Sequence, residues 1–255
     1  MRLVDGAEAI QGDLPSSSTH TVDVPLEAGD AQGSGVLRLS SLAIVRDRVA
    51  EQLRKLPSPV ITIGGDCGVE LGAIGTLAAP NVAVVWFDAH PDLNTPDTSP
   101  TGAFSGMVLR TLLGEGATEL VPARPLAPGQ VVLAGVRSFD AAEDEYLAQS
   151  GIPVIGPSDV TAESLVAAVR ATGATSVYIH IDLDVLDPAD IEGLAAPQPF
   201  GVRATTLVEV IRALTTSLPL AGAGIAAFAP ADVASAASDM PTVLRIIAAL
   251  TARPS

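Results

Sequence analysis

Three ionisable side chains follow an apolar run in the stretch VVWFDAHPDLN, residues 84–94. Asp88, His90 and Asp92 occupy every second position, and side chains at this spacing point to the same side of an extended strand. Carboxylates and an imidazole crowded together destabilise one another unless something compensates for their charge and desolvation. A divalent cation is the simplest compensation, so the spacing predicts metal ligands where a strand ends.

Two other stretches have the same character. In SVYIHIDLDVLDP, residues 176–188, the polar residues His180, Asp182 and Asp184 alternate with apolar ones. A third apolar run ends in the turn GGDCG, which contains Cys67. Three strands that each end in ligand-type side chains can converge on one point, so these stretches are expected to form a single site.

The mixture of ligand types indicates which ion such a site would bind. Four carboxylates and one imidazole suit a hard cation such as Mn²⁺ better than they suit the tetrahedral site of zinc. Carboxylates shared between ions suggest a two-metal hydrolase, in which the metals lie about 3.5–4 Å apart. We therefore expect two Mn²⁺ ions per subunit.

The elements that must position these residues follow from hydrophobic periodicity. The expected strands cover residues 58–65, 82–90, 130–137, 152–156, 176–185 and 221–230. The expected helices cover residues 36–56, 69–78, 140–150, 158–172, 205–217 and 240–252. Strands that alternate with helices and are continuously apolar predict an α/β fold, in which helices cover both faces of a mostly parallel sheet. Such a sheet carries its site at the carboxyl ends of the strands, where the polar residues stand.

No internal repeat or linker divides the sequence, so we expect one domain over residues 1–255. The segment 13–35 is rich in turn residues and is expected to lie on the surface. The net charge of −15 and the aromatic content of 3% argue against a nucleic-acid partner. We find no apolar segment long enough to span a membrane and no signal peptide, and the single Cys67 fits a reducing cytoplasm.

The sequence resembles the arginase family (ureohydrolases) over most of the chain from about residue 36 onward. The residues that carry the resemblance are GGDCG at 64–68, DAHPDLN at 88–94, TSPTGAFSGM at 98–107 and HIDLDVLDP at 180–188. The resemblance implies a three-layer α/β/α sandwich. Members of that family often form trimers or hexamers, so the resemblance also implies a homo-oligomer.

The resemblance further implies how the ligands are shared between two Mn²⁺ ions. Asp88, Asp92 and Asp182 would bind one ion, and Asp88, His90, Asp182 and Asp184 would bind the other. Asp88 and Asp182 would bridge the ions together with a hydroxide that attacks a guanidine carbon.

Four positions depart from the family pattern. Cys67 stands where the family usually has a histidine ligand, and we take it as a thiolate ligand, the alternative being a small buried thiol that binds nothing. Ser105 stands where arginases have a histidine thought to shuttle protons, and serine does not supply a proton readily near neutral pH. Ala227 replaces a glutamate that holds the guanidinium. His180 replaces a small residue and is a proton shuttle, a hydrogen-bond donor, an extra ligand or a buried neutral histidine.

We take Asp92, His180 and Ser105 as the catalytic candidates. Other positions match those at which the family binds the α-carboxylate and α-amino groups of an amino acid, namely Asn94, Ser99, Thr101, Asp140 and Glu143. The residues that would bind the amino-acid part of a substrate match the family, whereas those that would bind its guanidine group are altered. This combination suggests a substrate with a neutral guanidino group. The resemblance then narrows to the Nω-hydroxy-L-arginine amidinohydrolases, which form L-ornithine and hydroxyurea.

Two alternatives stay open. One is a plain arginase, agmatinase or guanidino-acid hydrolase, and the other is a non-catalytic metal-binding homologue. The amino terminus raises a further point, because family members usually begin with a strand, whereas LVDGAEAIQGDL is helical in pattern almost from Met1. Either that strand is absent or very short here, or the start of the chain was assigned too late.

Overall fold

Six parallel strands form one sheet in the computed structural model, which describes residues 3–77 and 81–252. The strands are β1 (Ile61–Ile63), β2 (Val82–Phe87), β3 (Val131–Ala134), β4 (Val154–Ile155), β5 (Ser176–Asp182) and β6 (Leu220–Ala226). Their spatial order is β1-β6-β5-β2-β3-β4. The order places β5 and β2, the two strands that precede the aspartate motifs, side by side at the centre.

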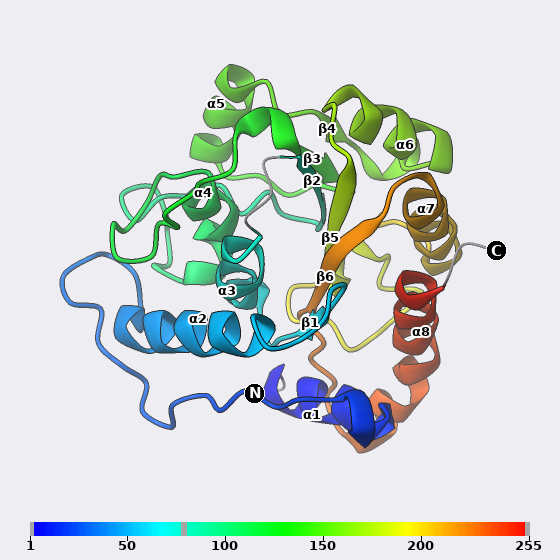
Figure 1. Ribbon diagram of the computed structural model, residues 1–255, viewed down its shortest axis with the longest axis horizontal. Coiled ribbons are helices and arrows are strands. Elements are labelled where there is room, and N and C mark those ends of the chain that lie inside the picture. The colour runs from blue at the N-terminus through cyan, green and yellow to red at the C-terminus, as the bar shows by residue number, and fades with distance from the viewer. Residues whose placement is uncertain (1–2, 78–80, 253–255) are drawn as a thin grey trace.

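Helices cover both faces of this sheet, with α2 to α5 on one side and α6 to α8 on the other (Figure 1). The helices are α1 (Leu3–Asp13), α2 (Leu39–Leu53), α3 (Glu70–Gly75), α4 (Val108–Leu112), α5 (Ala141–Ser150), α6 (Ala162–Ala171), α7 (Ala204–Ser217) and α8 (Val233–Thr251). The predicted three-layer α/β/α fold is confirmed.

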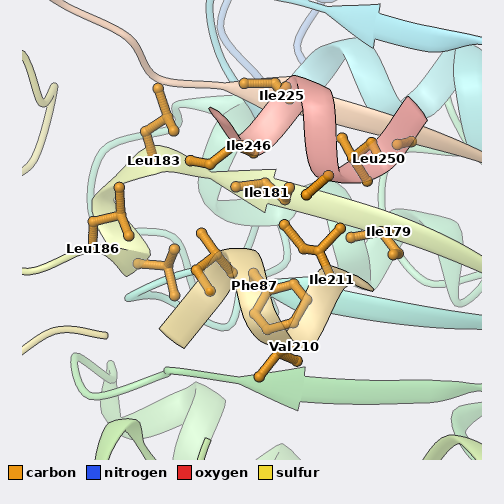
Figure 2. Packing of buried hydrophobic residues seen from close by; sticks show 14 of the residues in the cluster. Phe87, Ile179, Ile181, Leu183, Leu186, Val210, Ile211, Ile225, Ile246 and Leu250 are labelled. Carbon is orange, nitrogen blue, oxygen red and sulfur yellow. The ribbon is translucent and has the colours of Figure 1, made fainter. Parts of the chain in front are cut away.

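Strand alternation divides the core into two parts. In β5, Ile179 and Ile181 belong to the cluster that packs against α7 and α8, which Figure 2 shows around Phe87 and Ile211. Tyr178, between two residues of that cluster, belongs to the opposite cluster, which packs against α2, α3 and α4. Because successive side chains alternate between faces, His180 is directed to the same side as Tyr178.

The expected elements are all present, with different ends. The strands expected over 82–90 and 176–185 end at Phe87 and Asp182, so several polar residues lie beyond the ladder. The last helix begins at Val233 rather than at residue 240 and continues through Pro241. The helix expected over 69–78 ends at Gly75, and residue 78 lies outside the described residues.

Two helices lie outside the ranges expected above. The short helix α4 was not expected, because its five residues are too few to show a periodic pattern. The helical pattern near the amino terminus is confirmed as α1. Among the described residues, none before Ile61 belongs to a strand of the sheet.

Helix α8 is apolar and long enough to cross a membrane by length and composition, with a mean hydropathy of 1.3 over its most apolar window. One such helix is weak evidence, because the core helices of globular domains pass the same test. Ile246 and Leu250 of α8 lie buried against the sheet (Figure 2).

Candidate metal centre

The centre of the sheet brings the two aspartate motifs together. Trp86 of β2 is paired in register with His180 of β5, and Phe87 is paired with Ile181. Asp88 and Asp182 come next along the two strands, and both side chains are almost completely buried. Register between parallel neighbours therefore places these two carboxylates together at the carboxyl edge.

Beyond each strand the chain turns, and the ligand carboxylates themselves accept backbone hydrogen bonds in the turn. The backbone N–H of His90 donates to Asp88 Oδ1 at 2.7 Å, and the N–H of Asp184 donates to Asp182 Oδ1 at 2.8 Å. Asp92 has a positive φ of 53°. The expectation that simple strand alternation aligns all of these side chains is wrong, because tight turns direct Asp92, His90 and Asp184.

The ligand-type atoms lie within reach of one cation or two. Cys67 Sγ is 3.1 Å from Asp182 Oδ2 and 3.8 Å from Asp88 Oδ2. On the other side, His90 Nδ1 is 3.1 Å from Asp184 Oδ2 and 3.5 Å from Asp88 Oδ1. Asp88 thus takes part in two ligand groups, one with Cys67 and His180 and one with His90 and Asp184.

Without a cation the carboxylates oppose one another's ionisation. Burial and the charge of Asp184 raise the pKa of Asp88 to about 6. Burial, followed by the charges of neighbouring aspartates, also raises the pKa values of Asp92 and Asp182. Burial and the same aspartates raise the pKa of the Cys67 thiol. A bound cation favours the ionised form of each of these groups.

His90 and Asp184 form a pair in which the protein itself supplies the compensating charge. Burial lowers the pKa of His90, but the hydrogen bonds and charges of Asp184 and Asp88 outweigh it and raise this pKa to about 10. Burial opposes the ionisation of Asp184, yet the hydrogen bond and charge of His90 hold its pKa below the usual value. A metal ion in this position would replace the proton on His90.

Two buried atoms test whether the site suits a metal. Within residues 3–77 and 81–252, Asp92 Oδ2 and His180 Nε2 are buried and have no hydrogen-bond partner. Buried polar atoms are rarely left unpaired, because the loss of solvation costs free energy. A ring nitrogen of His180 lies within 4.8 Å of ligand atoms of Cys67 and Asp88, and Asp92 is close enough to Asp88 and Asp182 for their charges to raise its pKa. The residues present therefore suit a bound divalent metal.

The side chain of His180 is completely buried next to Cys67 and Asp88. Its Nδ1 is 2.8 Å from Glu70 Oε1, and its ring stacks on Trp86 with centroids 3.7 Å apart. The hydroxyl of Tyr178 donates to the other oxygen of Glu70. Sequence reasoning missed Glu70. Its only signal was an acidic residue in an apolar helix, three positions after Cys67.

The predicted substrate residues fall into two groups. Asn94 Nδ2 donates to Asp140 Oδ2 at 2.8 Å, so these two side chains meet. Glu143 is buried, and its carboxylate accepts from the backbone N–H groups of Leu93 and Asp140 at 2.9 Å each. These bonds make Glu143 a positioning residue for the loop after β2, and its contact with a substrate stays a prediction.

Ser99 and Thr101 stabilise their own loop. Their hydroxyl oxygens accept from the backbone N–H groups of Gly102 and Ala103, respectively. Ser105 lies in the 3₁₀ turn Phe104–Met107, whose Gly106 carbonyl accepts from the backbone N–H of Asn94. Ser105 is therefore carried by a turn that is fixed to the DAHPDLN loop, and the roles of these three side chains stay predictions.

Ala227 follows β6 in a left-handed backbone conformation, with φ of 66°, and it is buried. Its N–H donates to the carbonyl of Gly65 in the GGDCG turn. The methyl side chain offers no charge at this position, as the sequence indicates.

Arg137 is a second residue that sequence reasoning missed. Its guanidinium donates to the backbone carbonyls of Gly135, Asp184, Val185, Leu186, Gln198 and Pro199. The backbone N–H of Arg137 donates to the carbonyl of Ala89. Through its side chain and its backbone N–H together, Arg137 thus ties the loop after β5 to the loop after β2.

Comparison with known proteins shows what the chain is similar to. The arginase family model matches residues 10–249. The N(omega)-hydroxy-L-arginine amidinohydrolase of Streptomyces lavendulae is 32% identical over 247 residues, which cover 92% of this chain and 86% of that protein. The arginase of Bacillus subtilis is also 32% identical, over 71% of this chain and 66% of that protein, slightly less than two thirds of its length.

A solved structure agrees with the fold. The arginase of Entamoeba histolytica in complex with L-ornithine superposes with a TM-score of 0.88 at 23% identity, covering 99% of this chain and 94% of that one. At this identity the likeness concerns the fold alone. The family match over residues 10–249 and the relative that is 32% identical over 92% of the chain show that this protein belongs to the arginase family of hydrolases.

Proposed function

We propose that the protein is a binuclear manganese amidinohydrolase that cleaves a linear C–N bond of a guanidino amino acid. The proposed substrate is Nω-hydroxy-L-arginine, and water converts it to L-ornithine and hydroxyurea. The observation that carries the proposal is the cluster at the carboxyl edge of β2 and β5, formed by Cys67, Asp88, His90, Asp92, Asp182 and Asp184.

The donor set favours two hard cations that share a carboxylate. Asp88 belongs to both ligand groups, so it is placed to bridge. Two Mn²⁺ ions bound there would supply the Lewis acidity that makes a water molecule nucleophilic near neutral pH. Oxygen-rich sites favour Mn²⁺ over softer metals, and this preference is the reason for proposing manganese.

The altered guanidine end supports a hydroxylated substrate. Ala227 offers no carboxylate to pair with a guanidinium, and Ser105 is a poor proton donor near neutral pH. An N-hydroxyl group makes a guanidine less basic, so a neutral N-hydroxyguanidine needs no anionic partner. The paired Asn94 and Asp140 side chains are the proposed contacts of the amino-acid end.

A substrate comparison tests the proposal. Protein loaded with Mn²⁺ is assayed for ornithine released from L-arginine and from Nω-hydroxy-L-arginine. Asp182→Ala serves as the blank, and Asp144→Ala, on the exposed face of α5, serves as the matched control. We expect metal-dependent release chiefly from the hydroxylated compound in the unmodified protein and in Asp144→Ala.

Other results point to the alternatives. Release chiefly from L-arginine would overturn the substrate and favour a plain arginase. No release from either compound, with metal bound, would favour another guanidino substrate, such as agmatine, or a non-catalytic homologue.

We further propose a single arginase-like domain over residues 1–255 that assembles as a homo-oligomer, a trimer or a hexamer, in the cytoplasm. Family resemblance supports the assembly, and the single Cys67 supports the compartment. Sedimentation equilibrium of the purified protein tests the assembly, since a monomer at micromolar concentration would contradict it.

A further inference from the structure

We infer that His180 is a nitrogen ligand on the Cys67 side of the metal centre, and that Glu70 is the carboxylate that orients it. This inference rests on the metal centre of the proposed function, but not on the identity of the substrate. It concerns Glu70 and His180, which are not among the six proposed ligands.

The position of the ring is the first argument. The donor atoms of Cys67, Asp88 and His180 all lie within 4.8 Å of one another. His180 Nε2 is 4.0 Å from Asp88 Oδ2, which is too long for a hydrogen bond and leaves space for an atom between them. The ring is fully buried, and Nε2 has no hydrogen-bond partner among the described residues.

The hydrogen bonds of Glu70 indicate the tautomer. Its carboxylate accepts from the Tyr178 hydroxyl, and its second oxygen lies 2.8 Å from His180 Nδ1. In the tautomer that donates from Nδ1 to this carboxylate oxygen, the lone pair of the ring lies on Nε2, the atom nearest the cluster. In metal sites, a histidine ligand usually donates its other ring N–H to a partner such as a carboxylate, which orients the ring.

The surrounding residues fix the ring in this orientation. Trp86 stacks on His180 from the neighbouring strand, and its Nε1 donates to Asp88 Oδ2 at 3.2 Å. On the other neighbouring strand, Gly224 is in register with His180, and a Cβ at Gly224 would lie 1.5 Å from Glu70 Oε1. The glycine thus leaves the space through which Glu70 reaches the ring.

A buried histidine paired only with Glu70 is the competing reading. That reading leaves Nε2 without a partner in the interior, which costs free energy. A metal ion bound to Nε2 removes this cost. It also adds a nitrogen ligand beside the sulfur of Cys67.

Pulsed electron paramagnetic resonance tests the inference directly. The protein is produced with ¹⁵N-labelled histidine and receives less than one equivalent of Mn²⁺ per subunit. In a His90→Asn variant, His180 is the one histidine left in the cluster, since the third histidine, His20, is exposed. We expect a ¹⁵N coupling of directly bound nitrogen in this variant, and its loss in the His90→Asn/His180→Asn double variant.

Affinity gives a second measurement, by equilibrium dialysis of Mn²⁺. Asparagine at 180 keeps an amide near the place of Nδ1 for Glu70 and removes Nε2. Glu70→Gln should weaken Mn²⁺ binding roughly 10–100-fold, as expected for an orienting partner, and His180→Asn should weaken it at least as much. His20→Asn is the matched control and should leave the affinity unchanged.

The outcomes separate the inference from the proposed function. Bound Mn²⁺ without nitrogen coupling in His90→Asn would overturn the ligand role of His180 and leave the metal centre standing. No Mn²⁺ binding that depends on Asp88 and Asp182 would overturn both. The coupling in His90→Asn decides the matter even if the His180 variants fail to fold.

Discussion

Glu143 shows how a single buried carboxylate can stabilise a site without being a ligand. Its oxygens accept backbone hydrogen bonds from Asp140, the N-cap residue of α5, and from Leu93, in the loop that carries Asp92. Burial raises the pKa of Glu143, and these hydrogen bonds oppose that shift. The residue therefore couples the start of a helix to the loop that carries the candidate metal ligand Asp92.

We predict that Glu143→Ala lowers the free energy of unfolding by about 1–3 kcal/mol, because the buried N–H of Leu93 loses its acceptor. Urea denaturation of the metal-free protein measures the change. Glu145→Ala, on the exposed face of the same helix, should stay within about 0.5 kcal/mol of the unmodified protein. Equal losses for the two variants would show that the two hydrogen bonds contribute nothing specific.

At this scale the sequence predicts residues that act within one motif and misses residues that act across the fold. Asp88, His90 and Asp92 are readable because each follows the same strand within a few positions. Glu70 meets His180 across 110 positions, and no local pattern reports that contact.

At the level of elements, the loops after β2 and β5 act as one unit because Arg137 joins them. Its guanidinium binds six backbone carbonyls, among them that of the candidate ligand Asp184. A lysine ammonium has three donors at one point and cannot reproduce this planar arrangement.

We expect Arg137→Lys to lower the free energy of unfolding by about 1.5–3 kcal/mol or more, the net contribution of one hydrogen bond to a charged group. Mn²⁺ affinity should fall with it, because Asp184 is released. Thermal unfolding and equilibrium dialysis measure the two effects. Arg170→Lys, exposed on α6, is the matched control. An Arg137→Lys protein with unchanged Mn²⁺ affinity would contradict the joining role.

Element type was predictable from periodicity, whereas element ends were not. The alternation of polar and apolar residues continues from Asp182 to Val185, but the backbone leaves the ladder for a 3₁₀ turn in which Asp182 accepts from the N–H of Asp184. Local side-chain hydrogen bonds of this kind compete with strand pairing. The same competition ends β2 at Phe87, where Asp88 accepts from the N–H of His90.

For the whole molecule, the candidate metal centre lies at the carboxyl edge of a sheet with a well-packed core on each face, and it concentrates unfavourable charge. The sheet separates a core against α6 to α8 from one against α2 to α4, and Cys67 belongs to the second. Hydrophobic packing of both cores must therefore offset the buried carboxylates when no cation is bound. Stability should then respond to pH and metal together.

The sign of the pH dependence follows from two raised pKa values. The folded protein raises the pKa of Asp88 to about 6, so the stability from its protonated form is full below about pH 4 and is lost as the pH rises through 6. His90, with a pKa raised to about 10, contributes stability that is full below about pH 6.5 and is lost as the pH rises through 10. Both groups make the metal-free protein less stable at higher pH.

We therefore predict that the unfolding temperature in EDTA falls between about pH 5 and pH 9. Because Mn²⁺ competes with these protons, the stabilisation it gives should grow over the same range, reaching roughly 5–10 °C at about 100 times the dissociation constant for one site. Scanning calorimetry with and without Mn²⁺ measures both trends, and Asp88→Asn should flatten the first of them. A stabilisation by Mn²⁺ that is independent of pH would contradict binding at Asp88 and His90, because an ion bound there must displace the protons that these groups hold.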